Sequence, residues 1–216
     1  MKKKSVVILL FAVIILLSSC GGQNNKPAQE KEITVYATVN GEQIMSDEIE
    51  YFKTRSRAQI INEYAEKYGV TDFADFWDKE FDGKTPAESL EESALEQAVE
   101  AKIKLVLMRE NGVYEDVSFV GLKAKAETYN KEHENLKGNV GLKTVDLSSF
   151  YTYYVSTGEM ELKNILAEST LKPTADELAA AAEKNPDLTE NGQISAVVDE
   201  KYEKMIADLI DNAEIK

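Results

Sequence analysis

Cysteine and histidine are almost missing from this sequence, which leaves little material for catalytic or metal chemistry. The 216 residues include one cysteine, Cys20, and one histidine, His133. A Ser-His-Asp or Cys-His arrangement needs a histidine beside its nucleophile, and a structural zinc site needs several Cys or His ligands. His133 lies in the charged stretch NKEHENLK, where we expect it at a solvent-exposed helix end.

Glycine-rich phosphate-binding loops are missing as well. The sequence contains neither a Walker-type loop nor a Gly-x-Gly-x-x-Gly motif, the two patterns that hold phosphates beside a helix N-terminus. Acidic residues are plentiful, but they form no EF-hand loop, and no pair of them stands out as the two carboxylates of a glycoside hydrolase. We therefore expect no enzymatic activity, no cofactor and no metal.

Positive charge is in short supply. The chain has 25 Lys and Arg residues against 39 Asp and Glu residues, a formal net charge of −14. Nucleic acid is excluded as an expected partner because phosphate binding needs a basic surface, and a location flat on an anionic bilayer is disfavoured for the same reason. We interpret the acidic excess as a solvated surface; the alternative is attraction of basic polypeptides.

The first residues have the order of a secretory signal. Three lysines at positions 2 to 4 precede an unbroken apolar run from Val6 to Leu17, which is shorter than the roughly 20 residues of a membrane-spanning helix. The tetrad Leu17-Ser18-Ser19-Cys20 resembles the bacterial lipobox, in which the cysteine is lipidated and becomes the first mature residue. The resemblance implies a signal peptide over residues 1–19 and an extracytoplasmic lipoprotein, anchored to the bacterial cell membrane through palmitate on Cys20.

A short polar segment follows the predicted lipidation site. Residues 21–32, GGQNNKPAQEKE, contain no apolar side chain larger than alanine or proline, which is typical of a flexible linker. We expect residues 20–32 to be a tether between the membrane and the folded part. Loss of residues 1–19 removes three lysines and no acidic residue, so the formal net charge changes from −14 to −17.

Hydrophobic spacing and capping residues predict a mainly α fold. Residues 33–39 read as a strand that turns at Asn40-Gly41, and residues 193–198 as a second short strand. Thr85-Pro86-Ala87-Glu88 has the pattern of a capping box with proline at the first helical position. Helices are expected over residues 46–69, 85–110, 118–134, 147–167, 174–184 and 200–212, with a loop over 137–144.

Aromatic residues gather in two places that are candidates for a binding groove or for core. The first is the short segment 71–81, where Phe73, Phe76, Trp77 and Phe81 recur at helical spacings. The second is the run Phe150, Tyr151, Tyr153 and Tyr154. Adjacent residues of a helix point in different directions, so at least one ring of Tyr153-Tyr154 is expected to be exposed. We take both groups as candidate client-binding residues, with a core role left open.

The stretch ATVNGEQIMSDEIEYF, residues 37–52, resembles the start of the SurA-like N-terminal chaperone domain of PrsA-type foldase lipoproteins. The matching residues are Val39-Asn40-Gly41-Glu42, Ile44, Ser46 and Glu48. Residues 90–113 resemble the central helix of that domain, and residues 171–187 resemble the segment that leads into a parvulin prolyl isomerase domain. Only 29 residues follow Asp187, too few for that domain, so we expect neither the isomerase domain nor prolyl isomerase activity.

This resemblance implies a domain organisation and a function. Residues 33–190 would form the SurA N-terminal-like helical domain, and residues 191–216 a strand and helix that pack back onto it. The implied function is that of a non-catalytic, lipid-anchored holdase for unfolded secreted polypeptides. The alternative is an envelope lipoprotein that uses the same scaffold to bind one dedicated partner. A solute-binding lipoprotein is disfavoured because the sequence lacks repeated strand-helix units.

Overall fold

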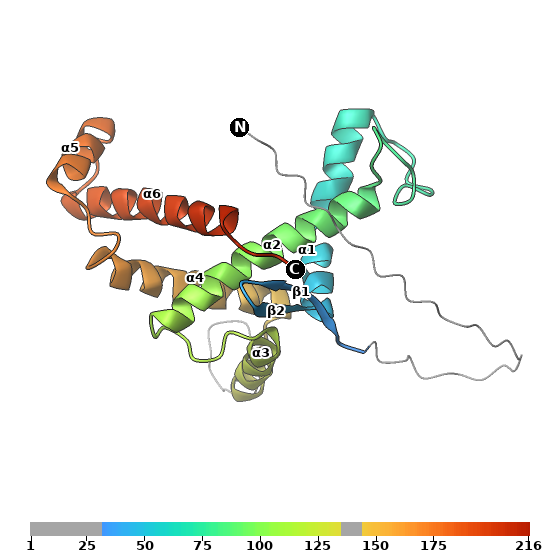
Figure 1. Cartoon of the computed structure of the whole chain (residues 1–216), viewed down its shortest axis with the longest axis horizontal. Helices are drawn as coiled ribbons and strands as arrows, with labels where there is room; N and C mark the ends of the chain where they lie inside the picture. Colours follow the sequence, from blue (N-terminus) through green and yellow to red (C-terminus); the bar gives the residue numbers. More distant parts are fainter. Residues whose placement is uncertain (1–31, 135–143) are drawn as a thin grey trace, which may run out of the picture. The chain divides into compact units, whose positions relative to one another are not determined.

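The computed structural model describes residues 32–134 and 144–216, and residues 33–216 form one compact unit. The predicted mainly α fold with a short N-terminal hairpin is confirmed (Figure 1). The predicted signal peptide, Cys20 and all of the predicted tether except Glu32 lie outside the described residues, as does most of the predicted loop 137–144. The elements are β1 (Val35–Val39), β2 (Glu42–Met45), α1 (Ser46–Tyr68), α2 (Pro86–Glu110), α3 (Phe119–His133), α4 (Leu147–Ala167), α5 (Ala175–Lys184) and α6 (Glu190–Asp211).

The predicted hairpin turn is present between β1 and β2. Asn40 and Gly41 both adopt positive φ, at 51° and 85°, as the tight turn between antiparallel strands requires. The strand starts at Val35, two residues later than predicted, and a bulge at Tyr36 interrupts its pairing with β2. The hairpin therefore delivers the chain directly into α1.

The start of α1 differs from the prediction by one residue. Met45 occupies the N-cap position in place of Ser46, and the Glu48 carboxylate accepts a hydrogen bond from the Met45 amide at 3.4 Å. The Ser46 hydroxyl is engaged elsewhere, because its Oγ accepts a hydrogen bond from the Thr34 amide at 3.1 Å. Ser46 thus ties the helix to the chain before β1. The predicted helix end at Gly69 is confirmed, with φ at 63°.

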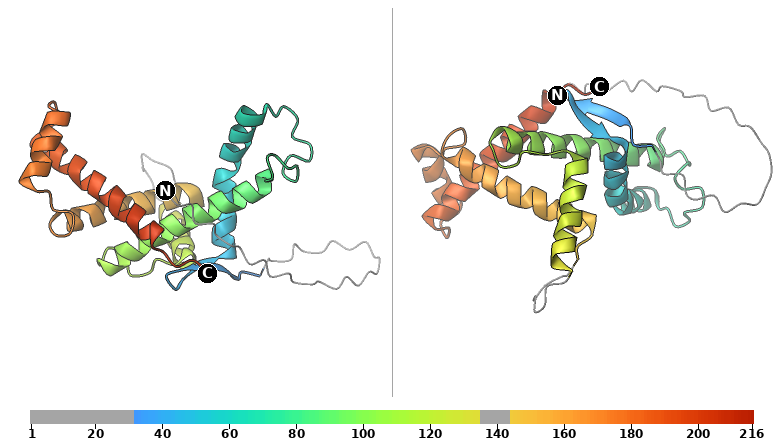
Figure 2. Two further views of the ribbon diagram at one scale, coloured as in Figure 1. Left: turned by 45° about the horizontal axis from the view of Figure 1, so that its top comes forward. Right: turned by 90° about the horizontal axis from the view of Figure 1, so that it is seen from below.

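Helix α2 is the central element of the unit. It contacts α1, both strands, α4 and α6 (Figures 1 and 2). Its predicted start is confirmed: Thr85 Oγ1 accepts from the Glu88 amide at 3.2 Å, and the Glu88 carboxylate accepts from the Thr85 amide at 2.8 Å. Apolar residues spaced by three or four positions along this helix are buried, namely Leu90, Ala94, Ala98, Ala101, Leu105 and Met108.

A second, smaller core closes the far end of α1 and α2. Its buried members are Ile60, Tyr64, Phe76 and Leu90. Segment 71–81 covers this core without forming the helix that its aromatic spacing suggested. Asp75 and Asp82 adopt positive φ, at 54° and 52°, a conformation that cannot continue a right-handed helix. The segment instead makes turns and an isolated bridge between Phe81 and Lys84.

The strand predicted over residues 193–198 is wrong, because these residues lie inside α6. Thr189 caps this helix by accepting a hydrogen bond from the Gly192 amide at 3.3 Å. Val198, Tyr202 and Ile206 recur at spacings of four and are buried, so one helical face runs through the predicted strand into the predicted helix. The sequence Gln193–Val198 is too short to distinguish a strand from a buried helical turn.

Extended residues follow α6 and complete the hairpin. Ile215 forms a bridge with Val39, while the Thr38 amide donates to the Lys216 carbonyl at 2.8 Å and the Lys216 amide donates back at 3.1 Å. The C-terminal segment packs back onto the preceding part of the unit, as expected: α6 contacts α2 and α4, and the residues after it reach the hairpin. Its extended residues come after the helix, whereas the prediction placed them before it.

Helix α4 crosses α2 closely at Gly158. A Cβ atom at this position would lie 2.5 Å from Tyr114 Cε2 and 2.8 Å from Met108 Sδ. The Tyr114 ring also stacks on Tyr154 with 4.0 Å between centroids, and its hydroxyl donates to the Tyr154 carbonyl at 2.9 Å. Glycine thus sets the position of α4 against the core.

We expect Gly158→Ala to destabilise the protein by about 1–3 kcal/mol, because the added methyl group overpacks this crossing. The loss should outweigh the higher helix propensity of alanine, which is worth about 1 kcal/mol. Urea unfolding followed by circular dichroism measures the change, with exposed Ser156→Ala on the same helix as the control. Unchanged or increased stability would show that α4 does not need the small residue.

Candidate functional site

The first group of predicted client-binding residues belongs mainly to the smaller core. Phe76 is 2% exposed, and Trp77 and Phe81 are half-buried beside it. The Arg57 guanidinium covers the Trp77 ring at 4.2 Å from its centroid. Only Phe73 offers a largely free ring, at 47% exposure. Of the two roles left open for this group, the core role applies to Phe76, which packs against Tyr64 and the neighbouring rings.

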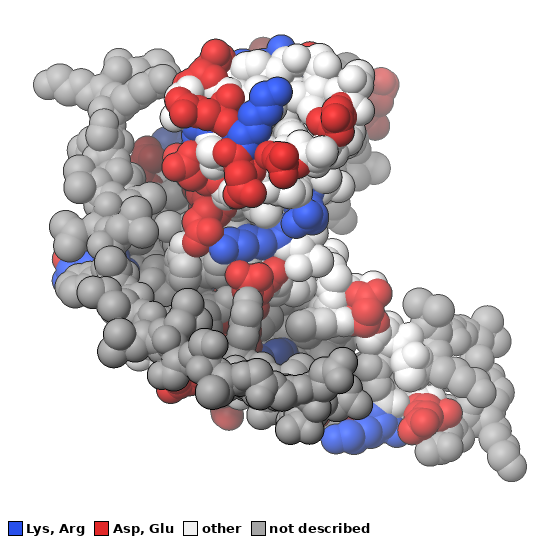
Figure 3. Space-filling view, turned by 90° about the vertical axis from the view of Figure 1, so that its right-hand side faces the viewer, with Lys and Arg blue, Asp and Glu red and all other residues white. Residues whose placement is uncertain are grey.

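The loop that carries Phe73 is strongly acidic. Its charged residues are Asp72, Asp75, Asp78, Lys79, Glu80 and Asp82, all exposed. Figure 3 looks at this side of the molecule and shows acidic side chains gathered over its upper part, with basic and uncharged side chains among them. Phe73 is thus a single exposed ring in an acidic setting and has no exposed aromatic neighbour in the group.

The second group of predicted residues divides between core and surface. Tyr151 and Tyr154 are buried, at 4% and 8% exposure, whereas Tyr153 is 63% exposed. Tyr151 packs against Tyr51 and Phe52, with ring centroids 4.9 and 5.8 Å apart, and its burial raises the pKa of its hydroxyl. The expectation that one ring of Tyr153-Tyr154 is exposed is confirmed. Tyr151 and Tyr154 are core residues.

Tyr153 lines a groove of about 550 Å³ between α3 and α4. Phe150 and Tyr129 form part of its apolar wall, and three charged residues line it: Asp116, Lys125 and Glu132. The Lys125 ammonium lies 4.8 Å from the Tyr154 ring centroid and donates to the Tyr154 hydroxyl at 2.6 Å. The groove therefore combines aromatic surface with a cation that is already held by the core.

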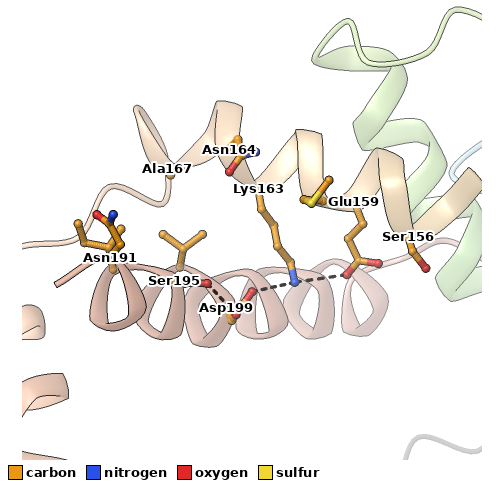
Figure 4. Close-up of a pocket in the computed structure, with 11 residues that line it drawn as sticks. Ser156, Glu159, Lys163, Asn164, Ala167, Asn191, Ser195 and Asp199 are labelled. Atoms are coloured by element: carbon orange, nitrogen blue, oxygen red, sulfur yellow. Dashed lines mark hydrogen bonds and ion pairs between the residues drawn. The ribbon is translucent and has the colours of Figure 1, made fainter. Parts of the chain in front are cut away.

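A second hollow, a cleft of about 600 Å³, lies between α4 and α6 (Figure 4). Lys163 crosses the gap from α4, and its ammonium lies 2.9 Å from Asp199 Oδ1 on α6 and 3.7 Å from Glu159 Oε1. The same ammonium lies 4.7 Å from the ring centroid of the buried Tyr202. The residues that line the cleft are Ser156, Glu159, Met160, Lys163, Asn164, Ala167, Asn191, Ile194, Ser195, Val198 and Asp199.

The ion pairs of the cleft continue to the central helix. Lys104 of α2 lies 3.7 Å from the Glu159 carboxylate and 2.9 Å from that of Glu100. Burial alone would lower the pKa of Lys104, but these two carboxylates outweigh it and the pKa is raised. Three helices thus meet through alternating charges beneath the cleft, which fixes α4 relative to α6.

The two hollows lie along one continuous stripe of α4. Tyr153 lines the groove, and Ser156, Met160, Asn164 and Ala167 line the cleft. Spacings of three and four place these residues on one side of the helix. Met160 is 62% exposed, although it is an apolar residue of this helix. The sequence alone indicates this stripe, because Tyr153 and Met160 are seven residues apart and therefore share a face of the helix.

A buried ion pair is the strongest polar feature that sequence analysis missed. Lys102 of α2 and Glu48 of α1 have side chains 4% and 1% exposed, and the Lys102 ammonium lies 3.1 Å from both carboxylate oxygens. Burial raises the pKa of Glu48 more strongly than Lys102 lowers it. No substrate can reach a pair so enclosed, so its role is to join the two helices.

His133 is half-buried, which corrects the expectation of a fully exposed residue. Its ring stacks on Tyr129 at 4.0 Å between centroids, and its Nδ1 lies 2.7 Å from the Tyr129 carbonyl oxygen. Within residues 32–134 and 144–216, no three His, Cys, Asp or Glu side chains are grouped as a metal site. No helix of the described part is long and apolar enough to span a membrane.

Comparison of the chain with protein-family models, with curated proteins and with solved structures gave no match. The resemblance to the SurA-like domain therefore stays a prediction from the residues that carry it. The mainly α fold and the geometry of the α4 stripe are the structural facts on which a function can be argued.

Proposed function

We propose that this protein is a lipid-anchored extracytoplasmic holdase that binds unfolded secreted polypeptides along the α4 stripe without catalysis. The observation that carries the proposal is the pair of hollows joined by Tyr153, Ser156, Met160, Asn164 and Ala167. Two large side chains on this stripe, Tyr153 and Met160, are each more than 60% exposed. Exposed apolar surface of this kind marks interaction sites in soluble domains.

The stripe has the dimensions of an extended peptide. Residues 153 to 167 span about 21 Å along the helix at a rise of about 1.5 Å per residue. Six residues of extended chain cover about 20 Å. Tyrosine supplies a rigid contact, whereas methionine adapts its shape to different partners. Asn164 adds an amide that can pair with the backbone of any sequence. These properties suit a binder with many clients.

The proposed location rests on the N-terminal sequence. The apolar run from Val6 to Leu17 followed by Leu17-Ser18-Ser19-Cys20 supports export and lipidation at Cys20. The polar residues up to Glu32 would hold the compact unit away from the bilayer, where exported chains emerge. The alternative, a lipoprotein with one dedicated envelope partner, would use the same stripe for a single native protein.

The test is an aggregation assay with three unrelated, chemically unfolded clients. A soluble form that begins at Gly21 retains the whole compact unit, and we expect near-stoichiometric amounts to slow aggregation of all three. A prolyl isomerase assay on a short peptide should show no acceleration. Failure to protect any client would contradict the holdase and favour the dedicated partner, which cross-linking in the native envelope would then identify.

A further inference from the structure

We propose that the α4 stripe selects polypeptide segments that are extended and positively charged, an inference that rests on the proposed holdase function. The stripe binds apolar side chains through Tyr153 and Met160, and the charged residues of its two hollows favour lysine and arginine in the client. The protein thereby favours unfolded chains that combine positive charge with apolar side chains, whatever their exact sequence.

Both hollows beside the stripe carry the same charge pattern. The groove between α3 and α4 is lined by Asp116, Glu132 and Lys125, and the cleft between α4 and α6 by two acids and one lysine in the same way. Each hollow therefore has one more negative than positive side chain. The formal net charge of −14 for the whole chain acts in the same direction. Electrostatic complementarity favours a cationic occupant and raises its association rate.

The lysines of the hollows are already committed to partners within the protein. Lys163 is held between Asp199 and Glu159, and only 22% of its side chain is exposed. Lys125 is held by the Tyr154 hydroxyl and ring. Two of the carboxylates remain accessible: the side chain of Asp199 is 53% exposed although it pairs with Lys163, and Glu132 is exposed with no ion-pair partner in the described part of the chain. An incoming peptide therefore meets acceptors before it meets cations.

Other occupants fit less well. A second copy of this chain carries the same net charge of −14, so two copies repel at low salt. An acidic segment would face the four carboxylates that line the hollows. A cationic segment with apolar side chains meets both requirements of the stripe, because its charges approach the rim while its apolar groups cover Tyr153 and Met160.

The experiment compares fluorescent 12-residue peptides that share their apolar positions and differ only in charge, one set with lysine and one with glutamate. Using the soluble form from Gly21, we expect the lysine peptide to bind at least about tenfold more tightly at low ionic strength. The preference should shrink as salt rises, because the screening length falls to about 10 Å at 0.1 M.

Two substitutions that break the same ion pair separate charge from structure. Asp199→Asn removes a carboxylate and leaves Lys163 less well paired, so affinity for the lysine peptide should fall about fivefold. Lys163→Gln removes the cation and frees Asp199, while Glu159 keeps Lys104, so the same affinity should rise about fivefold. A purely structural pair would move both values in one direction. Asp78→Asn makes the same change of charge on the loop that carries Phe73. It is the matched control and should have little effect on the affinity for the lysine peptide.

Each outcome decides between the ideas. Tight binding of the lysine peptide with opposite shifts in the two variants supports the inference. Equal binding of both peptide sets, or shifts of the same sign, overturns it and leaves the holdase intact. If no peptide binds and no client is protected, both the charge preference and the holdase function are contradicted. Dimerisation in sedimentation experiments, with peptide binding lost as dimers form, would identify a second copy as the occupant and overturn the inference.

Discussion

Replacing Lys102 by methionine is expected to lower the free energy of unfolding by about 3–5 kcal/mol, the usual cost of leaving a buried charge without its partner. The Lys102 ammonium lies 3.1 Å from both oxygens of Glu48, and the side chains are only 4% and 1% exposed. Methionine fills a similar volume, so the loss would come from the stranded carboxylate. Typical domains have about 5–15 kcal/mol of stability, so urea unfolding would register the change clearly.

The double variant Glu48→Gln/Lys102→Met is the control for this prediction. Glutamine keeps an oxygen that can accept the hydrogen bond of the Met45 amide, and it carries no charge. We expect the double variant to recover most of the lost stability, because an uncharged pair avoids the desolvation of two ions. If the double variant is as unstable as Lys102→Met alone, packing and not charge explains the loss.

The pH dependence of unfolding gives a second readout of the same pair. Burial raises the pKa of Glu48 above its ordinary value of 4.5, so the folded protein binds this proton more tightly than the unfolded chain. The contribution of Glu48 is therefore fully present below pH 4.5 and is lost as pH rises through the raised folded pKa. Without Lys102 the folded pKa rises further, so the difference between Lys102→Met and the double variant should grow from pH 4 to pH 7.

The variant Tyr153→Ala/Met160→Ala is expected to lose most of the protection of clients, with the concentration needed for half-protection raised about tenfold or more. Two central side chains that each contribute upwards of about 1 kcal/mol account for this factor. Both residues are more than 60% exposed, so removing them should change the unfolding free energy by less than about 0.5 kcal/mol. Aggregation kinetics and thermal unfolding measured on one preparation separate the two effects.

Two single variants locate the activity. Val120→Ala shortens an exposed apolar residue of α3 that does not line either hollow, and it should leave protection unchanged. Phe73→Ala removes the exposed ring of the acidic loop. If Phe73→Ala loses protection and the Tyr153→Ala/Met160→Ala variant keeps it, the binding surface lies on the loop between α1 and α2. That result would contradict the role of the stripe.

The parts of the fold that sequence could predict are those fixed by local interactions. The capping box at Thr85, the turn at Asn40-Gly41 and the α4 bounds 147–167 depend on residues within a few positions of one another. The strand expected over residues 193–198 failed because its apolar residues face a core built by other helices. Nothing within six residues reveals that environment, and only the continuation to Tyr202 and Ile206 identifies the helical face.

The candidate site was harder to predict because burial is a property of the assembled core. Tyr151, Tyr153 and Tyr154 have similar chemistry, and only the packing of α4 against Tyr51, Phe52 and Tyr114 decides which ring remains free. The ion pair of Glu48 and Lys102 joins residues 54 positions apart, so no local pattern announces it. The spacing of seven between Tyr153 and Met160 places both on one face of α4, but the sequence does not show that this face is exposed.

The pairing of Thr38 with Lys216 also constrains the order in which parts of the chain can fold during synthesis. The hairpin lies before all six helices that the structure describes, yet its third neighbour, the extended segment around Ile215, follows them and is synthesised later. Helices α1 and α2 can form their smaller core as soon as Leu90 is available. The third extended segment can pair only after residues 214–216 have been synthesised, and closing so long a loop is slow. Until then the edges of the hairpin stay unpaired, and unpaired strand edges favour aggregation of a partly folded chain.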